Sequence, residues 1–515
     1  MAEFIEIKVW PDQIDDFDQI KERARKKVKS KLHLNQLILV KRSIDARGRR
    51  PKYIYRFKIL KKGEVHEAFS FQYQKTNNSK RVIIVGAGPC GYFAALRLLE
   101  LNIKPILLER GKDVRKRRID LKNIQQKGIV NEHSNYCFGE GGAGTYSDGK
   151  LYTRSKKRGD IIGVLKQLVD HGANPEILYE AHPHIGSNKL PKIIAAIRET
   201  ILKHGGEIHF DHHVNDLIIK DGQLIGVVVK DKGEFMGDAV LLATGHSARD
   251  IYKLLHAHCI EMQRKPFALG VRIEHPQPLI DQIQYNQKTR EEGLPASSYR
   301  LACTMDDRGV FSFCMCPGGL VIPAATAPGE IVVNGMSLSR RDSPYANSGT
   351  VVAVNDKDYE RMGLDSIFGG LAFQQQVEQA FFNAGDGSQM APAQRLTDFV
   401  NGKISSDLNN TSYIPGLLSA PVHEILPEFI YKHLKMGILE FDKKMKGYFT
   451  ESANVIGTES RTSAPIKIPR ELDSLMHPQM KGLFPAGEGA GYAGGIMSAA
   501  MDGQRVADAI KTFID

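Results

Sequence analysis

The segment RVIIVGAGPCGYFAALRLLELNIKPILLERG, residues 81–111, decides the fold class of the chain. It starts with an apolar strand, passes through three glycines into an apolar helix that ends near Leu101, and continues into a second strand at residues 105–108. Three closely spaced glycines also occur in ordinary tight turns, but here a strand precedes them and a helix follows them. The segment therefore predicts the strand–turn–helix–strand unit that binds a dinucleotide.

Each glycine of this turn has a separate physical role. Gly86 permits the tight turn after the strand, Gly88 lets the backbone approach a pyrophosphate, and Gly91 allows the helix to pack closely on the strand. Glu109 lies 23 residues after Gly86, at the end of the second strand. Its carboxylate can accept hydrogen bonds from ribose hydroxyls and would repel a 2′-phosphate, so the segment favours FAD or NAD over NADP.

A second glycine-rich turn lies near the C-terminus, in GLFPAGEGAGYAGGIMSAAMDGQRVADAIKTFID, residues 482–515. It runs from Gly487 to Gly495 and leads into a terminal helix that begins at about Ile496. Glu488 in this turn can bind ribityl or ribose hydroxyls, and the N–H groups at the start of the helix can support the negative charge of a reduced flavin. NAD has no ring that needs this support, so the second turn favours FAD.

The residues between the two turns add strands but no second dinucleotide motif. Residues 192–214 have the pattern of a helix followed by a strand, and residues 215–246 that of antiparallel strands with a hairpin turn at Asp221-Gly222. The last of these strands ends at Ala243, Thr244 and Gly245. NAD(P)H, as a transient electron donor, would therefore dock without a domain of its own, or the electrons come from the substrate; the sequence leaves both open.

Several motifs carry a resemblance to known flavoproteins. The segments GAGPCG, LLERG, LLATGH and GLFPAGEGAGYAGG together resemble FAD-binding flavoproteins of the glutathione reductase type. More narrowly, FGEGGAGTYSDGKL, CMCPGG, NGMS, ESRTSAPIKIPR and GIMSAAMDG resemble an uncharacterised family of bacterial FAD-dependent dehydrogenases whose substrate is not established. The resemblance covers nearly the whole chain. One departure is Ala464, which stands where we expect a second serine.

The resemblance implies bound FAD and a set of residues close to it. The implied residues are Gly86, Gly88, Gly91, Glu109, Arg110, Gly142, Gly144, Val214, Gly245, Gly487, Glu488 and Gly495. Ala243, Thr244, Gly494 and Ile496 belong to the same turns and complete the predicted cofactor site. We expect the turns at residues 141–150, 314–319 and 494–496 to surround the flavin ring, because backbone without side chains can approach a flat ring closely.

The expected fold is α/β, with a Rossmann-like FAD-binding domain that is discontinuous in sequence. Residues 80–250 and 453–515 form this domain, because its nucleotide turns come from both ends of the region. Residues 251–452 form an inserted mixed α+β domain that caps the flavin and binds substrate. Residues 1–75 form a small N-terminal α/β module, and the polar stretch at residues 74–79 links it to the rest.

The N-terminal module holds nearly all of the net charge. Residues 1–62 contain 18 Lys and Arg against 8 Asp and Glu, whereas the whole chain has a formal net charge of +11. Such a module can bind nucleic acid or an acidic surface. The favoured interpretation is a solvated helix face and a basic loop, because no aromatic RNA-binding pattern accompanies the charge.

Three residues are candidates for chemistry: Lys150, Arg461 and Cys316. Lys150 or Arg461 could stabilise a reduced flavin or an anionic substrate, although a surface lysine and a structural arginine are the alternatives. Cys314 and Cys316 lie two apart on a predicted strand, on one face, and could form a thiol pair, contact the flavin or serve only as small core residues. No metal site is predicted, because no further ligands with suitable spacing lie near them.

The composition limits the class of protein. The chain has 515 residues, 42% of them hydrophobic, and six cysteines, which indicates a multidomain globular protein without a disulfide scaffold. It shows no secretion signal and no run of 18 uncharged apolar residues, so we expect a cytoplasmic protein.

The leading hypothesis is an FAD-dependent oxidoreductase that acts on a small molecule by hydride transfer. A flavoenzyme that modifies tRNA or other nucleic acid and a non-catalytic flavin-binding redox sensor remain alternatives, and the oligomeric state stays open.

Overall fold

The computed structural model describes the chain except residues 1–2, 29–35, 62–63, 65–68, 77–79 and 153–158. At its centre lies a five-stranded parallel sheet with strand order β22-β10-β4-β5-β6. The strands are β4 (Arg81–Val85), β5 (Lys104–Leu108), β6 (Glu207–His209), β10 (Ala239–Leu242) and β22 (Leu483–Pro485). Their nearly continuous apolar runs fit a sheet that is covered on both faces.

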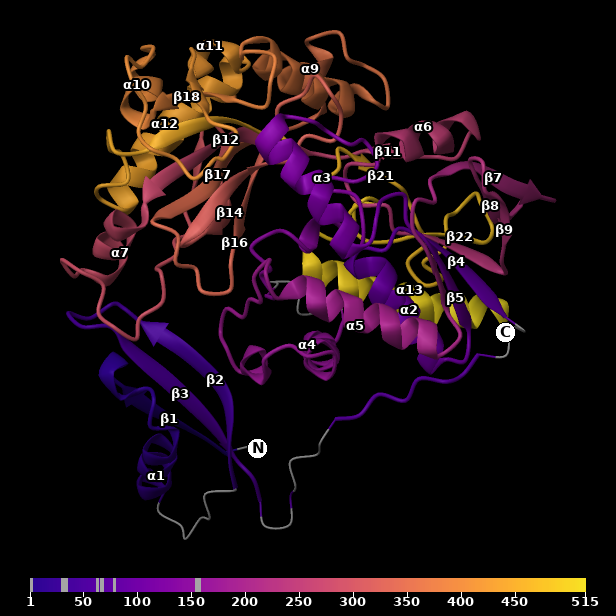
Figure 1. Ribbon diagram of the computed structural model, residues 1–515, viewed down its shortest axis with the longest axis horizontal. Helices are drawn as coiled ribbons and strands as arrows, with labels where there is room; N and C mark the ends of the chain where they lie inside the picture. The colour runs from indigo at the N-terminus through magenta and orange to yellow at the C-terminus, as the bar shows by residue number, and fades with distance from the viewer. Residues whose placement is uncertain (1–2, 29–35, 62–63, 65–68, 77–79, 153–158) are drawn as a thin grey trace.

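Helices from both ends of the region cover one face of this sheet (Figure 1). They are α2 (Pro89–Glu100), α4 (Ile161–Asp170), α5 (Leu190–Lys203) and α13 (Ile496–Ile514). On the other face a three-stranded antiparallel sheet, β7 (Val214–Lys220), β8 (Gln223–Val229) and β9 (Gly233–Met236), packs with helix α6 (Arg249–Ala257). The turn between β7 and β8 has positive φ at Asp221 (50°) and Gly222 (74°), as a tight hairpin requires.

The middle of the chain forms a second domain around a seven-stranded sheet with strand order β13-β14-β17-β12-β20-β18-β19. The strands are β12 (Phe267–Pro276), β13 (Ala302–Met305), β14 (Arg308–Cys316), β17 (Tyr345–Val354), β18 (Ala391–Arg395), β19 (Leu417–Ser419) and β20 (Asn454–Glu459). Helices α9 (Gly369–Asn383), α10 (Leu396–Asn401), α11 (Val422–Ile425) and α12 (Glu428–Lys444) share its apolar core.

The sheet of the inserted domain continues past its expected end. We expected the FAD-binding domain to resume at residue 453, but β20 pairs antiparallel with both β12 and β18. The chain therefore returns to the first domain only after Glu459. The sequence pattern did not reveal this because β20 is a fully buried strand, whose apolar run suits either domain.

Shorter elements connect the two large sheets. The ribbon β15 (Gly319–Pro323) and β16 (Val333–Ser337) faces α3 (Val114–Lys127), and β11 (Gln263–Arg264) pairs with β21 (Ile466–Lys467). Two more helices, α7 (Gln277–Tyr285) and α8 (Asp356–Glu360), belong to the inserted domain, and short 3-10 turns cover Pro11–Gln13, Gly142–Gly144 and Pro175–Leu178. No helix within the described ranges is long and apolar enough to cross a membrane.

The N-terminal module is a three-stranded antiparallel sheet covered by one helix (Figure 1). It consists of β1 (Glu3–Val9), α1 (Phe17–Lys27), β2 (Leu37–Asp45) and β3 (Lys52–Ile59). Residues 77–79 of the predicted linker lie outside the described residues.

Basic side chains of the module take part in its docking onto the other two domains. Arg42 pairs with Glu180, and Arg50 pairs with Glu291. Tyr53 donates a hydrogen bond of 2.6 Å to the carbonyl oxygen of Gly293. These contacts neutralise part of the charge that the sequence concentrates in this module.

Candidate functional site

A cavity of about 510 Å³ lies at the carboxyl ends of β4, β5 and β10, where the first domain meets the inserted domain. Ligands of open parallel sheets bind at this edge. Sixteen of the predicted site residues line the cavity: Gly86, Gly88, Glu109, Arg110, Gly142, Gly144, Lys150, Val214, Ala243, Thr244, Gly245, Arg461, Glu488, Gly494, Gly495 and Ile496. Gly91, Gly487 and Cys316 do not line it.

The glycines after β4 have the geometry of a pyrophosphate cradle. Gly86 has a φ of 105°, and a Cβ atom on it would lie 2.5 Å from the carbonyl oxygen of Ala243. A Cβ on Gly91 would lie 2.0 Å from the carbonyl oxygen of Gly86, so this glycine serves close packing behind the cavity. A Cβ on Gly88 would meet nothing closer than the Cα of Gly142, at 3.9 Å, so Gly88 faces open space at the start of α2. An anion fits there, because the first N–H groups of a helix have no partner within it.

Glu109 is held at the end of β5 by backbone donors. The carboxylate is 5% exposed and accepts hydrogen bonds of 2.9 Å from the N–H groups of Ala87, Gly111 and Gly139. Among the described residues, the N–H group of Ala87 is the only donor to Oε2, whereas Gly111 and Gly139 donate to Oε1. Oε2 can therefore accept one more hydrogen bond, such as that of a ribose hydroxyl.

Arg110 forms the next part of the wall. Its guanidinium makes two hydrogen bonds to Asp250, of 3.0 and 2.8 Å, and lies 4.4 Å from the centre of the Phe138 ring. Burial acts to raise the pKa of Asp250, but His213 and Arg110 lower it below its usual range. The carboxylate is therefore charged and fixes the guanidinium, so that Arg110 offers a planar cationic surface beside the cavity.

The C-terminal turn brings the start of α13 to the cavity. A Cβ on Gly494 or on Gly495 would have no neighbour within 4 Å, so both residues present bare backbone to open space. Gly487 lies behind this surface and donates a hydrogen bond of 2.8 Å to Asp502, which pairs with Arg470. The positive end of a 19-residue helix is therefore available to a group that acquires negative charge.

The glycine-rich turn at residues 142–144 contacts both the turn that contains Gly88 and the start of helix α13. A Cβ on Gly142 would lie 3.2 Å from the Cα of Gly88, and a Cβ on Gly144 would lie 2.8 Å from Cγ1 of Ile496. Glycine turns from three distant parts of the sequence thus meet in one place. The arrangement fits FAD, because an elongated dinucleotide needs bare backbone along its length.

Lys150 brings a positive charge into the cavity wall. Its Nζ lies 3.8 Å from the carboxylate of Asp148, donates to the carbonyl oxygen of Met315, and lies 3.9 Å from Sγ of Cys314. Burial acts to lower the pKa of Lys150, but Cys314, Cys316 and Asp148 raise it above its usual value. The ammonium group is therefore charged at neutral pH.

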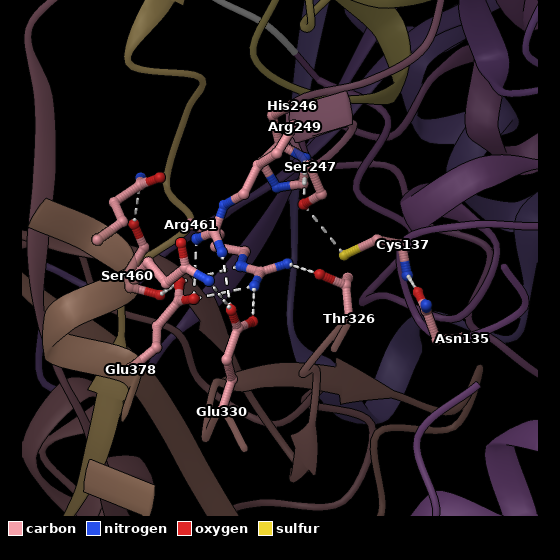
Figure 2. Close-up of polar contacts among 12 residues, drawn as sticks. Asn135, Cys137, His246, Ser247, Arg249, Thr326, Glu330, Glu378, Ser460 and Arg461 are labelled. Atoms are coloured by element: carbon pink, nitrogen blue, oxygen red, sulfur yellow. Dashed lines mark hydrogen bonds and ion pairs between the residues drawn. The ribbon is translucent and has the colours of Figure 1, made fainter. Parts of the chain in front are cut away.

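Arg461 lines the cavity, but its charge is used in a buried network (Figure 2). Its guanidinium pairs with Glu378 at 3.0 Å and Glu330 at 2.8 Å and donates to the hydroxyl of Thr326. Arg249 pairs with the same two carboxylates, at 2.9 Å to Glu330 and 2.8 Å to Glu378. The expectation of a cation free to stabilise the flavin is thus corrected: the geometry gives Arg461 a structural role at the floor of the site.

The cysteine pair also differs from the expectation. Cys314 lines the cavity, whereas Cys316, the residue predicted to act, is fully buried behind it. β14 is irregular here, since its register with β17 shifts between Phe313 and Cys316 and Cys314 has a φ of 46°. A regular two-residue alternation therefore does not describe the segment, and the residue of the pair that reaches the cavity is Cys314.

Sequence patterns did not indicate several of the polar residues around the site. Arg249, Glu330 and Glu378 form the network around Arg461, and Arg272 lies buried beside Glu459 and Cys314. These residues lie 42 to 187 positions from their partners in the sequence, so no local motif could connect them. Asn334, which also lines the cavity, belongs to the NGMS motif that the sequence resemblance included.

Comparison with known proteins supports the cofactor. Residues 266–462 match the family model described as "FAD-dependent protein, C-terminal domain-like", and residues 1–60 match a domain of unknown function, DUF8436. An uncharacterized protein of Clostridium beijerinckii (strain ATCC 51743 / NCIMB 8052) is 40% identical over 523 residues, which cover 97% of each chain.

Similar solved structures have low identity. They include glycine oxidase from Bacillus cereus ATCC 14579, with 12% identity over 86% of this chain and 95% of that chain and a TM-score of 0.30. The halogenase PltM in complex with FAD has 10% identity over 85% of this chain and 70% of that chain, with a TM-score of 0.40. The flavin-dependent brominase Bmp2 has 12% identity over 84% and 79% and a TM-score of 0.37. Likeness at this level indicates neither reaction nor substrate.

The family match and the glycine-lined cavity together define an FAD-dependent flavoprotein. The chain belongs to the same family as the Clostridium beijerinckii protein, with which it aligns from end to end. FAD is its cofactor.

Proposed function

We propose that this protein is an FAD-dependent oxidoreductase that oxidises or reduces a small molecule by hydride transfer at the flavin, as expected of the uncharacterised bacterial dehydrogenases that it resembles. The observation that carries the proposal is the charged Lys150 in the wall of a cavity built from three glycine turns. FAD supplies an acceptor for two electrons and a proton. Everything else in the reaction depends on how the chain binds, orients and charges the groups in this cavity.

The binding residues divide by position along the cavity. The start of α2 at Gly88 would hold the pyrophosphate, and Glu109 would hold the ribose, since both lie at the carboxyl ends of β4 and β5. The turn at Gly494 and Gly495 would lie beside the flavin ring, with the positive end of α13 pointing toward that ring.

Lys150 would stabilise negative charge near the flavin ring. A fixed ammonium group stabilises the charge that develops during hydride transfer more than water does, because the ammonium group needs no reorganisation. Asp148 is 1% exposed and accepts hydrogen bonds of 2.5 Å from Ser337 and Arg341, so its carboxylate is fixed and is paired with Arg341 more closely than with Lys150, which lies 3.8 Å away. Substrate would enter beside Phe313, Cys314 and Asn334, the cavity residues that the inserted domain contributes.

Turnover by purified protein tests the proposal. The holoprotein is mixed anaerobically with NADH, NADPH and a panel of small alcohols, amines, hydroxy acids and enones, and flavin absorbance is followed. We expect at least one compound to reduce the flavin, and Lys150→Met to slow that reduction by about 10²-fold or more while FAD stays bound. Lys432→Met is the matched control, since Lys432 is an exposed lysine on α12. Equal rates in all three proteins, or a flavin that no donor reduces, would refute the proposal, the latter in favour of a non-catalytic sensor.

A further inference from the structure

Two thiols with different access lie close together here, one lining the cavity and one buried behind it. The Cys316 thiol donates a hydrogen bond of 3.3 Å to the carbonyl oxygen of Cys314. Cys314 lines the cavity and is partly exposed, whereas Cys316 has no exposed surface. A small molecule that enters the cavity can therefore meet Cys314 directly and Cys316 only after Cys314 has reacted.

Cationic groups surround the exposed thiol. Nζ of Lys150 lies 3.9 Å from Sγ of Cys314, and the buried guanidinium of Arg272 donates a hydrogen bond of 3.0 Å to the Cys314 carbonyl oxygen. The anionic groups nearby are Asp148 and Glu459, each of which is already paired with a cation. The sulfur thus stands among fixed positive charges, the setting in which a cysteine reacts as a thiolate.

The protonation of the pair agrees with this geometry. The neighbouring Cys316 side chain has the largest influence on Cys314, and together with Lys150 and Arg272 it holds the pKa of the Cys314 thiol well below its usual range despite burial. The Cys314 side chain, with burial, raises the pKa of Cys316. One cysteine is therefore a thiolate while its neighbour keeps its proton, which is the division of roles that an attacking and a resolving thiol need.

The backbone is irregular where the two cysteines lie. Cys314 has a φ of 46°, in the left-handed region that non-glycine residues rarely adopt, and the strand register shifts at this point. The pair therefore departs from the regular alternation of a strand, and Sγ of Cys316 lies 3.3 Å from the backbone carbonyl oxygen of Cys314. Such local strain persists when the surrounding structure fixes it, and it is typical of functional sites.

We propose that Cys314 and Cys316 form a redox-active dithiol that reacts with small disulfides admitted to the cavity. The Cys314 thiolate attacks one sulfur of the disulfide RSSR, forms a Cys314–S–S–R bond and releases RS⁻. Cys316 then loses its proton and attacks the Cys314 sulfur, which breaks that bond, closes a Cys314–Cys316 disulfide and releases a second RS⁻, which takes the proton as RSH. The pair loses two electrons and the small disulfide gains them, and the reaction does not depend on flavin turnover.

Peptide mass mapping of the holoprotein tests the proposal directly. The protein is incubated with glutathione disulfide and, separately, with dithiothreitol, and then alkylated and digested. We expect the peptide with Cys314 and Cys316 to lose two hydrogens and both alkylation sites with glutathione disulfide, and to regain them with dithiothreitol. Cys303, on β13 of the same sheet, is the internal control and stays alkylatable throughout. Cys316→Ser should instead retain glutathione on Cys314.

The rate of alkylation gives a second readout. Cys314 should react with iodoacetamide at nearly the same rate at pH 6 and pH 7, whereas a thiol with the ordinary pKa of about 8.5 slows about tenfold per pH unit. Lys150→Met should restore the ordinary slope in part. A stable glutathione adduct on Cys314 in the wild-type protein, or no reaction at either cysteine, would overturn the proposal, whatever the outcome of the tests of flavin reduction.

Discussion

Nζ of Lys150 lies 3.9 Å from Sγ of Cys314, across the junction between the FAD-binding domain and the inserted domain. Lys150 follows a glycine turn of the first domain, and Cys314 lies on β14 of the second. The contact joins a fixed positive charge to a thiol in the cavity assigned to FAD. Both domains therefore contribute charged and reactive groups to the wall of this cavity.

The reduction potential of the bound flavin should depend on Lys150. Its ammonium group stabilises the negatively charged reduced form more than the neutral oxidised form, so Lys150→Met should lower the midpoint potential. We expect a shift of about 30 mV or more, the equivalent of about 1.4 kcal/mol for a two-electron couple. Equilibration with a reference dye measures it without knowledge of the substrate. A potential that is unchanged in Lys150→Met, or that changes as much in Lys432→Met, would remove Lys150 from the account.

Arg461 should affect stability more than chemistry. Arg461→Met leaves Arg249 as the only cation paired with Glu330 and Glu378 among the described residues, and breaking a buried ion network from one side typically costs about 3–5 kcal/mol. We expect a clear fall in the midpoint of urea unfolding of the holoprotein, with an unchanged potential in the fraction that stays folded. Arg461→Lys should lie between the two proteins. Normal stability combined with slow flavin reduction would return Arg461 to the chemical role that the sequence suggested.

Glu459 should make stability depend on pH. Burial raises the pKa of this carboxyl to about 7, against the opposing influence of Arg272. Because the pKa is higher in the folded than in the unfolded state, the folded protein binds more protons between about pH 4.5 and 7, and stability falls as the pH rises through this range. The effect is at most about 3 kcal/mol. Urea unfolding at pH 5, 6, 7 and 8 measures the slope, and Glu459→Gln should remove it; the same slope in both proteins would contradict the assignment.

The basic module should bind nucleic acid only weakly. Arg42 and Arg50 are engaged by Glu180 and Glu291, so they add little to a phosphate-binding surface. We expect a dissociation constant no better than about 10⁻⁴ to 10⁻⁶ M at physiological salt, with affinity that falls steeply as salt rises. A fluorescence anisotropy titration with tRNA and with random duplex DNA measures both. Submicromolar, sequence-selective binding would instead favour a nucleic-acid-modifying enzyme.

Local patterns in the sequence predicted the parts of the fold that depend on neighbouring residues. The strand, turn and helix around Gly86, Gly88 and Gly91 follow from residue types within one 31-residue segment, and the structure has each element in that place. The hairpin at Asp221-Gly222 was predicted in the same way, because the turn needs residues that accept positive φ.

Features that depend on distant partners could not be predicted. Arg461 pairs with Glu378 and Glu330, which lie 83 and 131 residues away in the sequence. Nothing in the segment ESRTSAP indicates that its guanidinium is paired with two carboxylates. Cys314 reaches the cavity in place of the predicted Cys316 because the register between β14 and β17 shifts at this point. This shift depends on pairing with a strand that is distant in sequence. The end of the inserted domain depends on the pairing of β20 with β12 and β18 for the same reason.

The measurement that tests the central claim most directly is the cofactor content of Gly88→Leu. Gly88 has a φ of −79°, so a leucine causes no backbone strain there, and its side chain would extend into the space assigned to the pyrophosphate. Gly48→Leu is the matched control, since a Cβ there meets nothing closer than 4.0 Å and the residue is far from the cavity in the basic loop of the N-terminal module. We predict that the wild-type protein and Gly48→Leu release about one FAD per chain on denaturation, and that Gly88→Leu folds but binds FAD at least about tenfold more weakly. Full FAD occupancy in folded Gly88→Leu, or release of FMN from the wild-type protein, would contradict the account.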